Sequence, residues 1–361
     1  MSKKVFITGG TGFIGQALIK QLIAKDYHVT ALARTHHGAQ KLKQLGATPI
    51  IGDIIDAHSM RPGMEGADIL FHVAAWYKLG SPDWMQAETI NVGGTRKVMR
   101  LALELNIPKI VYTSTIAVFG NTDGELVDEN YYAAGPFLTE YDRTKWLAHY
   151  KVVLPLIQKG APITIVMPGV VYGPGDTSFL HTLMSTFYRG EMPIVFGPET
   201  TLTFAHVEDV ATGHILAAEK GTIGESYILA GPAIPLGEMF DFWAHLDNRA
   251  TPLVRIPAFL LHPFIPLIKL FNRFYPLPPM YSAEAIRSLG AQYTARADKA
   301  RAQLGWQTRS LHDGMREMMD YVATTSSPPA PKGERRVAKL ILLAALILYL
   351  YWRWRQRRQK A

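Results

Sequence analysis

Hydrophobic residues in the first half of the chain gather into short runs separated by segments of helix length. Six of these runs have the residue types of buried strands, at 5–8, 28–33, 49–52, 69–74, 110–114 and 163–167. Strand-like runs that alternate with helices are typical of parallel sheets whose two faces are both covered. The pattern therefore predicts an α/β fold with a doubly wound parallel sheet.

The alternation weakens after about residue 170, where proline and glycine become frequent. We expect residues 1–323 to form one domain, in which about 1–170 carry the sheet and about 171–323 form a smaller lobe. Proline, serine and threonine then dominate the composition, as is typical of an extended linker. We assign residues 324–336 to this linker.

The last hydrophobic run differs from the others in length. Residues 337–354 would form about 27 Å of helix against ~30 Å of bilayer hydrocarbon. Lys339 and Arg353 can reach toward water at the two ends, beside aromatic residues that suit a membrane interface. The sequence predicts a transmembrane or membrane-anchor helix here, followed by a basic tail at 355–361. An amphipathic or core helix is the alternative, but the run lacks a polar face.

Positive charge is concentrated in the C-terminal segment that begins at Lys332. The chain has 38 Lys and Arg against 30 Asp and Glu, a formal net charge of +8. Nine of these basic residues, against Glu334 alone, lie from Lys332 onward, so the rest of the chain is neutral. A neutral folded part does not attract a nucleic-acid backbone, and we expect no nucleic-acid partner. The chain has no cysteine, which excludes thiolate metal sites and thiol catalysis; we predict no metal site.

A glycine-rich segment at residues 5–15 joins the first predicted strand to a helix. Gly9 suits a tight turn, Gly12 leaves room for a pyrophosphate, and Gly15 lets the helix pack closely. The free N–H groups of that helix N-terminus attract phosphate. The predicted dinucleotide contacts of this loop are Gly9, Thr11, Gly12, Phe13, Ile14 and Gly15. An ordinary strand-to-helix turn is the alternative.

Tyr141 and Lys145 are candidates for acid–base chemistry. Four residues apart on a helix, they share one face, so the ammonium can lower the pKa of the phenol and hold a ribose. The hydroxyl residues Ser114 and Thr115 stand at the end of the predicted strand at 110–114. Tyr-x-x-x-Lys is a common pattern, and its weight comes from this position in the chain.

These motifs together resemble a known family. The spacing Gly9-x-x-Gly12-x-x-Gly15 is that of short-chain dehydrogenases, and residues 114–120 are similar to the Ser-Thr-Asp-Glu-Val-Tyr-Gly of sugar-nucleotide dehydratases. Over about residues 3–323 the chain resembles the extended short-chain dehydrogenase/reductase family, of the NAD-dependent epimerase/dehydratase type. It is similar to dihydroflavonol reductase-like and 3β-hydroxysteroid dehydrogenase-like members. The resemblance implies a Rossmann-type sheet. The catalytic residues that it implies are Tyr141, Lys145, Thr115 and, as the fallback, Ser114.

The residue after the second strand indicates the cofactor. A carboxylate there binds the ribose hydroxyls of NAD, whereas an arginine accommodates the extra phosphate of NADP. The chain places Arg34 at this point and Lys41 one or two helical turns further on. We expect NADP(H) to be preferred; NAD(H) is the alternative, with both side chains then plain surface cations. By resemblance, the further cofactor contacts are Asp53, Ile54, Ala74, Ala75, Lys145, Pro168, Val170 and Val171.

Departures from the family pattern bear on the substrate. Ile116 and Ala117 stand where dehydratases carry an Asp-Glu pair, which argues against dehydration. The segment before His206 lacks the arginine with which nucleotide-sugar enzymes could meet a substrate diphosphate, which argues against an epimerase. We expect His206 and Asp209 to cap and pack a helix rather than to act in catalysis. An apolar, proline-broken stretch at 256–271 is similar to steroid dehydrogenases of the extended branch. We expect this stretch to be a buried lobe helix rather than a lipid-facing wall.

We therefore predict an NAD(P)-dependent oxidoreductase that moves hydride between nicotinamide and a carbonyl or secondary alcohol of an apolar steroid-, flavonoid- or lipid-like substrate. The alternatives are a nucleotide-sugar epimerase and a non-catalytic NADP-binding membrane scaffold or redox sensor. The acid–base pair argues against a scaffold. Because the cofactor is cytosolic and no signal peptide precedes the domain, we expect a cytoplasmic catalytic domain on a single-pass C-terminal membrane anchor. The sequence leaves the oligomeric state open.

Overall fold

The structure is a computed structural model that describes residues 2–78, 83–274 and 282–326. The anchor helix predicted at 337–354 and the basic tail at 355–361 lie outside the described residues, as does most of the linker at 324–336. Within the described part of the chain, no helix is both long and apolar enough to cross a membrane.

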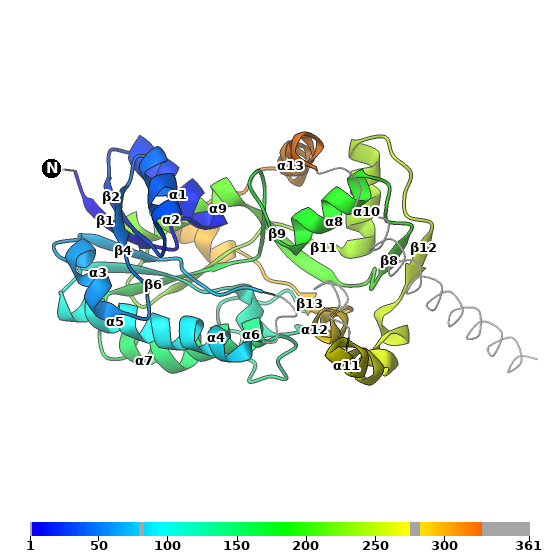
Figure 1. Cartoon of the computed structure of the whole chain (residues 1–361), viewed down its shortest axis with the longest axis horizontal. Coiled ribbons are helices and arrows are strands. Elements are labelled where there is room, and N and C mark those ends of the chain that lie inside the picture. The colour runs from blue at the N-terminus through cyan, green and yellow to red at the C-terminus, as the bar shows by residue number, and fades with distance from the viewer. Residues whose placement is uncertain (1, 79–82, 275–281, 327–361) are drawn as a thin grey trace, which may run out of the picture.

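A seven-stranded parallel sheet forms the centre of the larger part of the molecule (Figure 1). The strand order is β10-β6-β5-β4-β1-β2-β3, so the connections change direction between β1 and β4. The predicted doubly wound parallel sheet is confirmed. Its strands are β1 Lys4–Thr8, β2 His28–Ala33, β3 Thr48–Ile51, β4 Ile69–His72, β5 Lys109–Thr113, β6 Ile163–Pro168 and β10 Ser226–Leu229.

Helices cover both faces of this sheet, with α1, α2 and α9 on one face and α3, α5 and α7 on the other (Figure 1). Because both faces are covered, every residue of β4 and β6 is buried, which explains the continuous hydrophobic runs in the sequence. The helical elements around the sheet are α1 Phe13–Ala24, α2 His36–Gln44, α3 Ala57–Met64, α4 Trp84–Glu88, η1 Thr89–Gly94, α5 Thr95–Glu104, η2 Ile116–Phe119, α6 Glu140–Trp146, η3 Leu147–Val153, α7 Leu154–Ile157, α9 Val207–Glu219 and η7 Ala300–Leu304.

The second part of the molecule packs small sheets against helices. Strand β9 pairs with β7, β11 and β13, and β8 pairs with β12. The strands are β7 Val170–Tyr172, β8 Ile194–Phe196, β9 Thr201–His206, β11 Ala233–Pro235, β12 Val254–Ile256 and β13 Gln292–Tyr293. The helical elements are α8 Phe179–Tyr188, α10 Leu236–Leu246, η4 Ala258–Leu260, η5 His262–Phe264, α11 Ile265–Phe274, α12 Ala283–Ser288 and α13 Leu311–Thr325.

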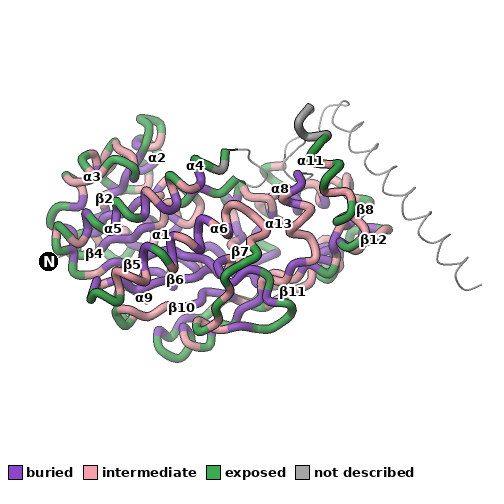
Figure 2. Tube along the Cα trace, turned by 90° about the horizontal axis from the view of Figure 1, so that it is seen from below, coloured by how far each residue is buried: buried purple, intermediate pink, exposed green. Residues whose placement is uncertain are grey.

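Buried hydrophobic side chains form two clusters. One lies around the seven-stranded sheet, and the other lies among α8, α10 and α13 and includes Phe240 and Trp243. Figure 2 shows the buried residues concentrated along the strands, while the outer helices carry the exposed positions.

The apolar stretch at 256–271 corrects one of our expectations. Ile256 and Ala258 are buried, as expected, but Phe259, Leu267 and Leu270 are each more than half exposed. The stretch therefore forms a surface helix rather than a buried lobe helix. The physical reason is that, among the described elements, α11 packs mainly against α12 and η5.

Candidate active site

The loop between β1 and α1 is shaped by close backbone approaches at its glycines. Gly9 has φ +77°, and a Cβ built on it would lie 2.6 Å from the main-chain nitrogen of Ala74. A Cβ on Gly15 would lie 2.2 Å from the carbonyl oxygen of Gly9. Any side chain at either position would collide with main-chain atoms, so the predicted tight turn and close helix packing are confirmed.

The N-terminus of α1 can accept an anion. Gly12 is its N-cap residue, no side chain caps the helix, and its first turn contains no acidic residue. The N–H groups of that turn therefore retain their capacity to bind a phosphate. Phe13 and Ile14 lie in this turn and Thr11 just before it, and all three are partly buried, as contacts with a bound dinucleotide require.

A buried histidine supports the floor of this loop. His72, at the end of β4, has Thr8 Oγ1 2.7 Å from its Nδ1 and Thr95 Oγ1 3.0 Å from its Nε2. Burial lowers the pKa of His72 to about 3, so the ring is neutral. Thr8 Oγ1 also accepts a hydrogen bond from the main-chain nitrogen of Ala74. This chain of contacts positions Ala74 and the adjoining Ala75, and sequence reasoning missed it.

The two predicted adenosine-side groups follow neighbouring strands. Ala33 of β2 is paired with Ile51 of β3, so Arg34 and Asp53, which follow them, come to the same edge of the sheet. Asp53 is partly buried, and its carboxylate accepts a hydrogen bond from the main-chain nitrogen of Ile55. The adjoining Ile54 is buried.

The cations predicted to bind the extra phosphate both face solvent. Arg34 and Lys41 are exposed, with Lys41 on α2. The side chain of Thr35 caps α2. Three polar features therefore stand at the end of β2: an arginine, a capped helix N-terminus and a lysine one turn along.

Helix α6 carries the predicted acid–base pair. Lys145 is only 3 % exposed, and its Nζ donates a hydrogen bond of 2.7 Å to the carbonyl oxygen of Thr113. It also lies 3.4 Å from the hydroxyl of Tyr112. Burial lowers the pKa of Lys145 to about 7. The ammonium is thus directed at the end of β5.

Tyr141 lies one turn before Lys145 and is half-buried. Its ring meets that of Tyr77 edge to face, with 4.8 Å between ring centroids. Burial raises the pKa of the phenol, and a hydrogen bond with the side chain of Thr115 partly offsets this. The pKa of Tyr141 is therefore raised, whereas we expected the Lys145 ammonium to lower it. The reason is that burial removes the phenolate from water, and the neighbouring groups stabilise it less than the lost water did.

The two candidate hydroxyls have different partners. Thr115 contacts Tyr141, and its Oγ1 also accepts a hydrogen bond of 3.2 Å from the nitrogen of Ala117. Ser114 is turned the other way, with its Oγ 2.8 Å from Nδ1 of the buried His149. Of the two hydroxyls, that of Thr115 is therefore the one beside the phenol.

Helix α6 is braced by Asn91, another residue that sequence reasoning missed. Its Nδ2 donates to Thr144 Oγ1 at 2.9 Å and to the carbonyl oxygen of Trp76, while its Oδ1 accepts from the nitrogen of Trp76. The amide thereby ties the segment after β4 to the helix of Tyr141. An asparagine with these buried partners has no local sequence signal.

The start of α6 is held from the second part of the molecule. Thr139 and Asp142 form a reciprocal capping box, and the hydroxyl of Tyr293 donates to Asp142 Oδ2 at 2.9 Å. Glu284 of α12 accepts a hydrogen bond of 2.7 Å from the nitrogen of Glu140. Burial raises the pKa of Asp142 to about 6. Segments far apart in the sequence therefore fix the position of the phenol.

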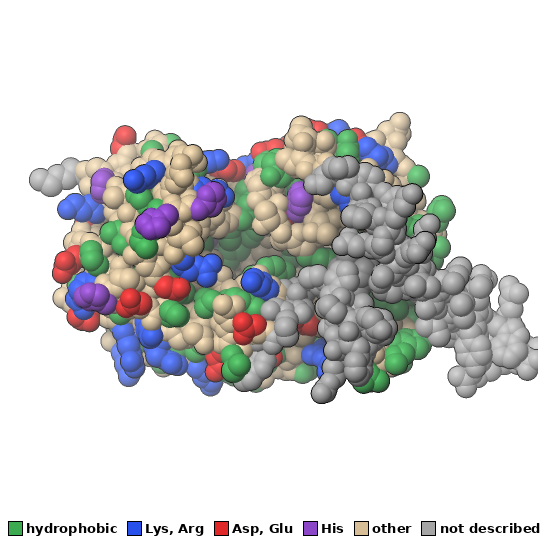
Figure 3. Space-filling view, viewed as in Figure 1, with side chains coloured by type: hydrophobic (Ala, Val, Ile, Leu, Met, Phe, Trp, Pro, Cys, Tyr) green, Lys and Arg blue, Asp and Glu red, His purple; other side chains and the backbone are tan. Residues whose placement is uncertain are grey.

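The predicted nicotinamide-side residues lie where β6 passes into β7. Pro168 ends β6, and Val170 and Val171 are partly exposed in β7. A Cβ on the intervening Gly169 would lie 2.3 Å from the carbonyl oxygen of Thr203. Figure 3 shows a hollow between the two parts of the molecule, with hydrophobic side chains at its floor.

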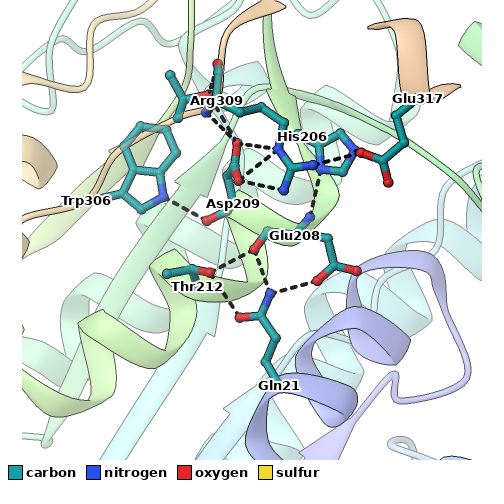
Figure 4. A network of polar contacts seen from close by, with 9 residues as sticks. Gln21, His206, Glu208, Asp209, Thr212, Trp306, Arg309 and Glu317 are labelled. Carbon is teal, nitrogen blue, oxygen red and sulfur yellow. Dashed lines mark hydrogen bonds and ion pairs between the residues drawn. The ribbon is translucent and has the colours of Figure 1, made fainter. Parts of the chain in front are cut away.

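His206 and Asp209 serve the structural roles expected from the sequence. His206 caps α9 by accepting from the nitrogen of Glu208, and Asp209 forms an ion pair of 3.0 Å with Arg309 (Figure 4). Trp306, which is fully buried, donates to the carbonyl oxygen of Asp209 at 2.7 Å. This network joins the start of α9 to the segment before α13.

The loop after β1 requires glycine at two positions and leads into a helix N-terminus that no side chain caps. It lies where the strand order of the parallel sheet reverses. This combination is typical of dinucleotide-binding proteins of the Rossmann type. Residues 5–230 match the NAD dependent epimerase/dehydratase family, and the chain belongs to that family. This confirms the resemblance to extended short-chain dehydrogenases. The protein is an NAD(P)-dependent oxidoreductase of this family.

Proteins of similar sequence and structure extend over nearly the whole described chain. The 4-hydroxy-2-methyl-3-oxo-4-farnesyl-3,4-dihydroquinoline-1-oxide ketoreductase of Stigmatella aurantiaca is 32% identical over 86% of this chain and 93% of its own length. The sterol demethylase protein B of Methylococcus capsulatus is 30% identical over 83% and 92%. The crystal structure of gox2253 is 31% identical, covers 90% of this chain and 98% of its own, and superposes with a TM-score of 0.79.

Proposed function

We propose that this enzyme transfers hydride between NADP(H) and a carbonyl or secondary alcohol on an apolar substrate of steroid, flavonoid or lipid type. The observation that carries the proposal is that Tyr141, one turn before Lys145 on α6, lies beside the hydroxyl of Thr115. A proton donor, a second hydroxyl and a cation at one strand end are what carbonyl reduction requires.

The dinucleotide has a cradle that fits it. The space beside Gly9 and Gly15 excludes any side chain, and the N-terminus of α1 offers free N–H groups to a pyrophosphate. Lys145 would hold the nicotinamide ribose, and Pro168, Val170 and Val171 would line the nicotinamide. The nicotinamide supplies or accepts the hydride.

The protein's own groups act on the substrate oxygen. Tyr141 donates its phenolic proton to the carbonyl oxygen during reduction and takes it back during oxidation, and Thr115 holds the same oxygen by a hydrogen bond. A phenol whose pKa is raised by burial stays protonated until it donates. A cation at Lys145 favours the phenolate that is left after donation.

NADP(H) rather than NAD(H) is supported by the residues after β2. Arg34 stands where a carboxylate would select NAD, and Lys41 follows it on α2. Both side chains are exposed and can close on a phosphate from solvent, where charge-assisted hydrogen bonds are among the stronger polar contacts.

An apolar substrate is supported by three observations. The hollow between the two parts of the molecule has a hydrophobic floor (Figure 3). Ile116 and Ala117 provide no proton-transfer groups for sugar dehydration. The two relatives described above are named for a farnesyl quinoline oxide and for sterols.

We also propose that residues 337–354 anchor the enzyme to a membrane by a single C-terminal helix, with the catalytic part on the cytoplasmic side. The support is the apolar run itself, its terminal cations and its aromatic residues. This placement keeps the dinucleotide site in the compartment that holds the cofactor.

A substrate panel tests the proposed function. Purified full-length protein is incubated with NADPH or NADH and with sterol ketones, flavonoid-like ketones or nucleotide sugars, and cofactor oxidation and products are followed. We expect NADPH oxidation with at least one apolar ketone. Conversion of a nucleotide sugar to its epimer without net cofactor consumption would instead identify an epimerase.

A further inference from the structure

Four large hydrophobic side chains in one stretch of the second part of the molecule are more than half exposed. Leu253, Phe259, Leu267 and Leu270 are 90%, 58%, 63% and 57% exposed. They come from successive parts of this stretch, namely the segment before β12, η4 and α11, and we call its exposed side the 253–270 face. Figure 2 shows α11 at the outer edge of the second part of the molecule, with exposed positions along it.

The 253–270 face is firmly held from behind. The nitrogen of Ala258 donates to Glu199 Oε1 at 2.6 Å, and His262 Nε2 lies 3.1 Å from the carbonyl oxygen of Leu289. Strand β12, between Leu253 and η4, pairs with β8. The apolar side chains are thus presented outward by a fixed scaffold, and their exposure is a property of the fold.

Charge indicates what covers this face. The sequence contains no Asp or Glu from residue 248 to residue 283, while Lys269 is exposed on α11. Arg249 and Arg255 lie at its edge and pair with the acidic residues Asp247 and Asp241. Because those two arginines are paired, the exposed Lys269 is the cation of the face itself, and a stretch that supplies an exposed lysine and no Asp or Glu matches the headgroups of an anionic bilayer.

Two other occupants fit less well. The chain's own apolar run at 337–354 is proposed above to enter the bilayer as the anchor, and the basic residues that flank it would add positive charge to this face. A second copy would bring the same acid-free face against itself. Neither offers the negative charge that complements Lys269.

We propose that the 253–270 face enters the interface of an anionic lipid bilayer as a peripheral contact of the catalytic part itself. The contact is separate from the C-terminal anchor and from the chemistry of the site. The face is nevertheless connected to the start of α6. Helix α11 packs on α12, and Glu284 of α12 accepts a hydrogen bond from the main-chain nitrogen of Glu140, next to Tyr141.

The absence of cysteine allows a direct test on the full chain, because one introduced cysteine gives a single labelled position. Leu267→Cys, on the proposed contact, is compared with Ile223→Cys, an equally apolar position that is 53% exposed in the loop before β10. Both carry a polarity-sensitive fluorophore, and both proteins are reconstituted in vesicles of phosphatidylcholine and phosphatidylserine. Quenching is measured with brominated phospholipid in the bilayer and with iodide in the water.

We expect brominated lipid to quench the label at position 267 at least about twofold more than the label at 223, and iodide to quench it less. Replacing phosphatidylserine with phosphatidylcholine should reduce the lipid quenching at 267. Equal iodide quenching at both positions would overturn the proposal. So would a label at 267 that is shielded from iodide without being quenched by lipid, because protein would then cover the face. Lipid quenching that is unaffected by phosphatidylserine would overturn the role of anionic lipid.

Discussion

Lys145 Nζ donates a hydrogen bond of 2.7 Å to the main-chain carbonyl oxygen of Thr113. The side chain is almost fully buried, and the pKa of its ammonium is lowered to about 7 because burial removes it from water. A buried cation with a strongly shifted pKa is typical of functional sites rather than of structural ones. The fold therefore keeps Lys145 at a cost in stability.

That cost can be measured by replacing the ammonium with an apolar group of similar length. We expect Lys145→Met to abolish turnover but to raise the midpoint of thermal unfolding by at least ~3 °C at neutral pH in the absence of dinucleotide, since a few kcal/mol of burial penalty are relieved. Differential scanning calorimetry checks this. A lower midpoint in the variant would show that the hydrogen bond to Thr113 outweighs the penalty.

The same shift predicts a dependence of stability on pH. Between pH 7 and 10.5 the unfolded chain keeps the proton of Lys145 and the folded protein has released it. The free energy of unfolding of the wild type should therefore rise over this range relative to Lys145→Met, and the difference should be constant below pH 7. Denaturant titrations of both proteins at several pH values test the sign. Parallel curves from pH 7 to 10.5 would mean that the folded pKa is unshifted.

Removing the phenolic hydroxyl tests proton transfer. We expect Tyr141→Phe to lower kcat by about 10²- to 10⁴-fold, because a positioned acid contributes that much, while the dissociation constant for the dinucleotide changes by less than ~2-fold. Steady-state kinetics and a fluorescence titration of the cofactor separate the two effects. Undiminished turnover in the variant would refute the assigned mechanism.

Ser114 and Thr115 are adjacent hydroxyl residues, so alanine substitutions at the two positions make a matched comparison. We expect Thr115→Ala to lower kcat by about 10²-fold, the usual effect of losing one hydrogen bond to the reacting oxygen. Ser114→Ala should have a smaller effect, because the Ser114 hydroxyl faces His149. Kinetics of both variants, with circular dichroism as the folding control, decide between them. A larger loss for Ser114→Ala would reassign the substrate-binding hydroxyl.

Cofactor preference should depend on Arg34. We expect the wild type to bind NADPH more tightly than NADH, and Arg34→Ala to weaken NADPH binding by about 10- to 100-fold while leaving NADH binding nearly unchanged. Isothermal titration calorimetry with both cofactors measures this, with Lys43→Ala, another exposed cation of α2, as the control. Tighter NADH binding in the wild type, unaffected by the substitution, would place the phosphate site elsewhere.

The parallel sheet was predictable from sequence because most of its strands are buried on both faces and form continuous apolar runs, although the edge strand β3 is only partly buried. The predicted run at 28–33 coincides with β2, and that at 163–167 differs from β6 by one residue. The seventh strand, β10, was missed because it follows a long excursion into the second part of the molecule. Its place beside β6 depends on that three-dimensional path rather than on a local pattern.

The places of Gly9 and of the α6 residues in the fold were predictable, because their motifs combine spacing with position in the chain. The buried residues that support the site could not be predicted from the sequence. His72 and Asn91 act through partners that are distant in sequence, such as Thr8 and Thr144, and a single buried polar residue carries no local sign of its partner. The exposure of Leu267 was missed for a related reason, since hydrophobicity does not reveal whether a covering surface exists.

The C-terminal anchor is tested by truncation. We expect the full-length protein to sediment with membranes and to resist extraction at high salt, because a spanning helix is held by hydrocarbon rather than by charge. A chain that ends at Pro331 should be recovered in the soluble fraction and should still reduce its substrate. Fractionation followed by an activity assay checks both. Release of the full-length protein by salt alone would mean that the tail makes only an electrostatic contact.

Transfer of label from the cofactor to the product tests the central claim most directly. NADPH deuterated at nicotinamide C4, on the face that the enzyme uses, is incubated with the wild type or Tyr141→Phe and an apolar ketone, and the product is analysed by mass spectrometry. We predict one deuterium on the new carbinol carbon with the wild type and little product with the variant. A product without deuterium, or turnover confined to nucleotide sugars with no net consumption of NADPH, would contradict the account.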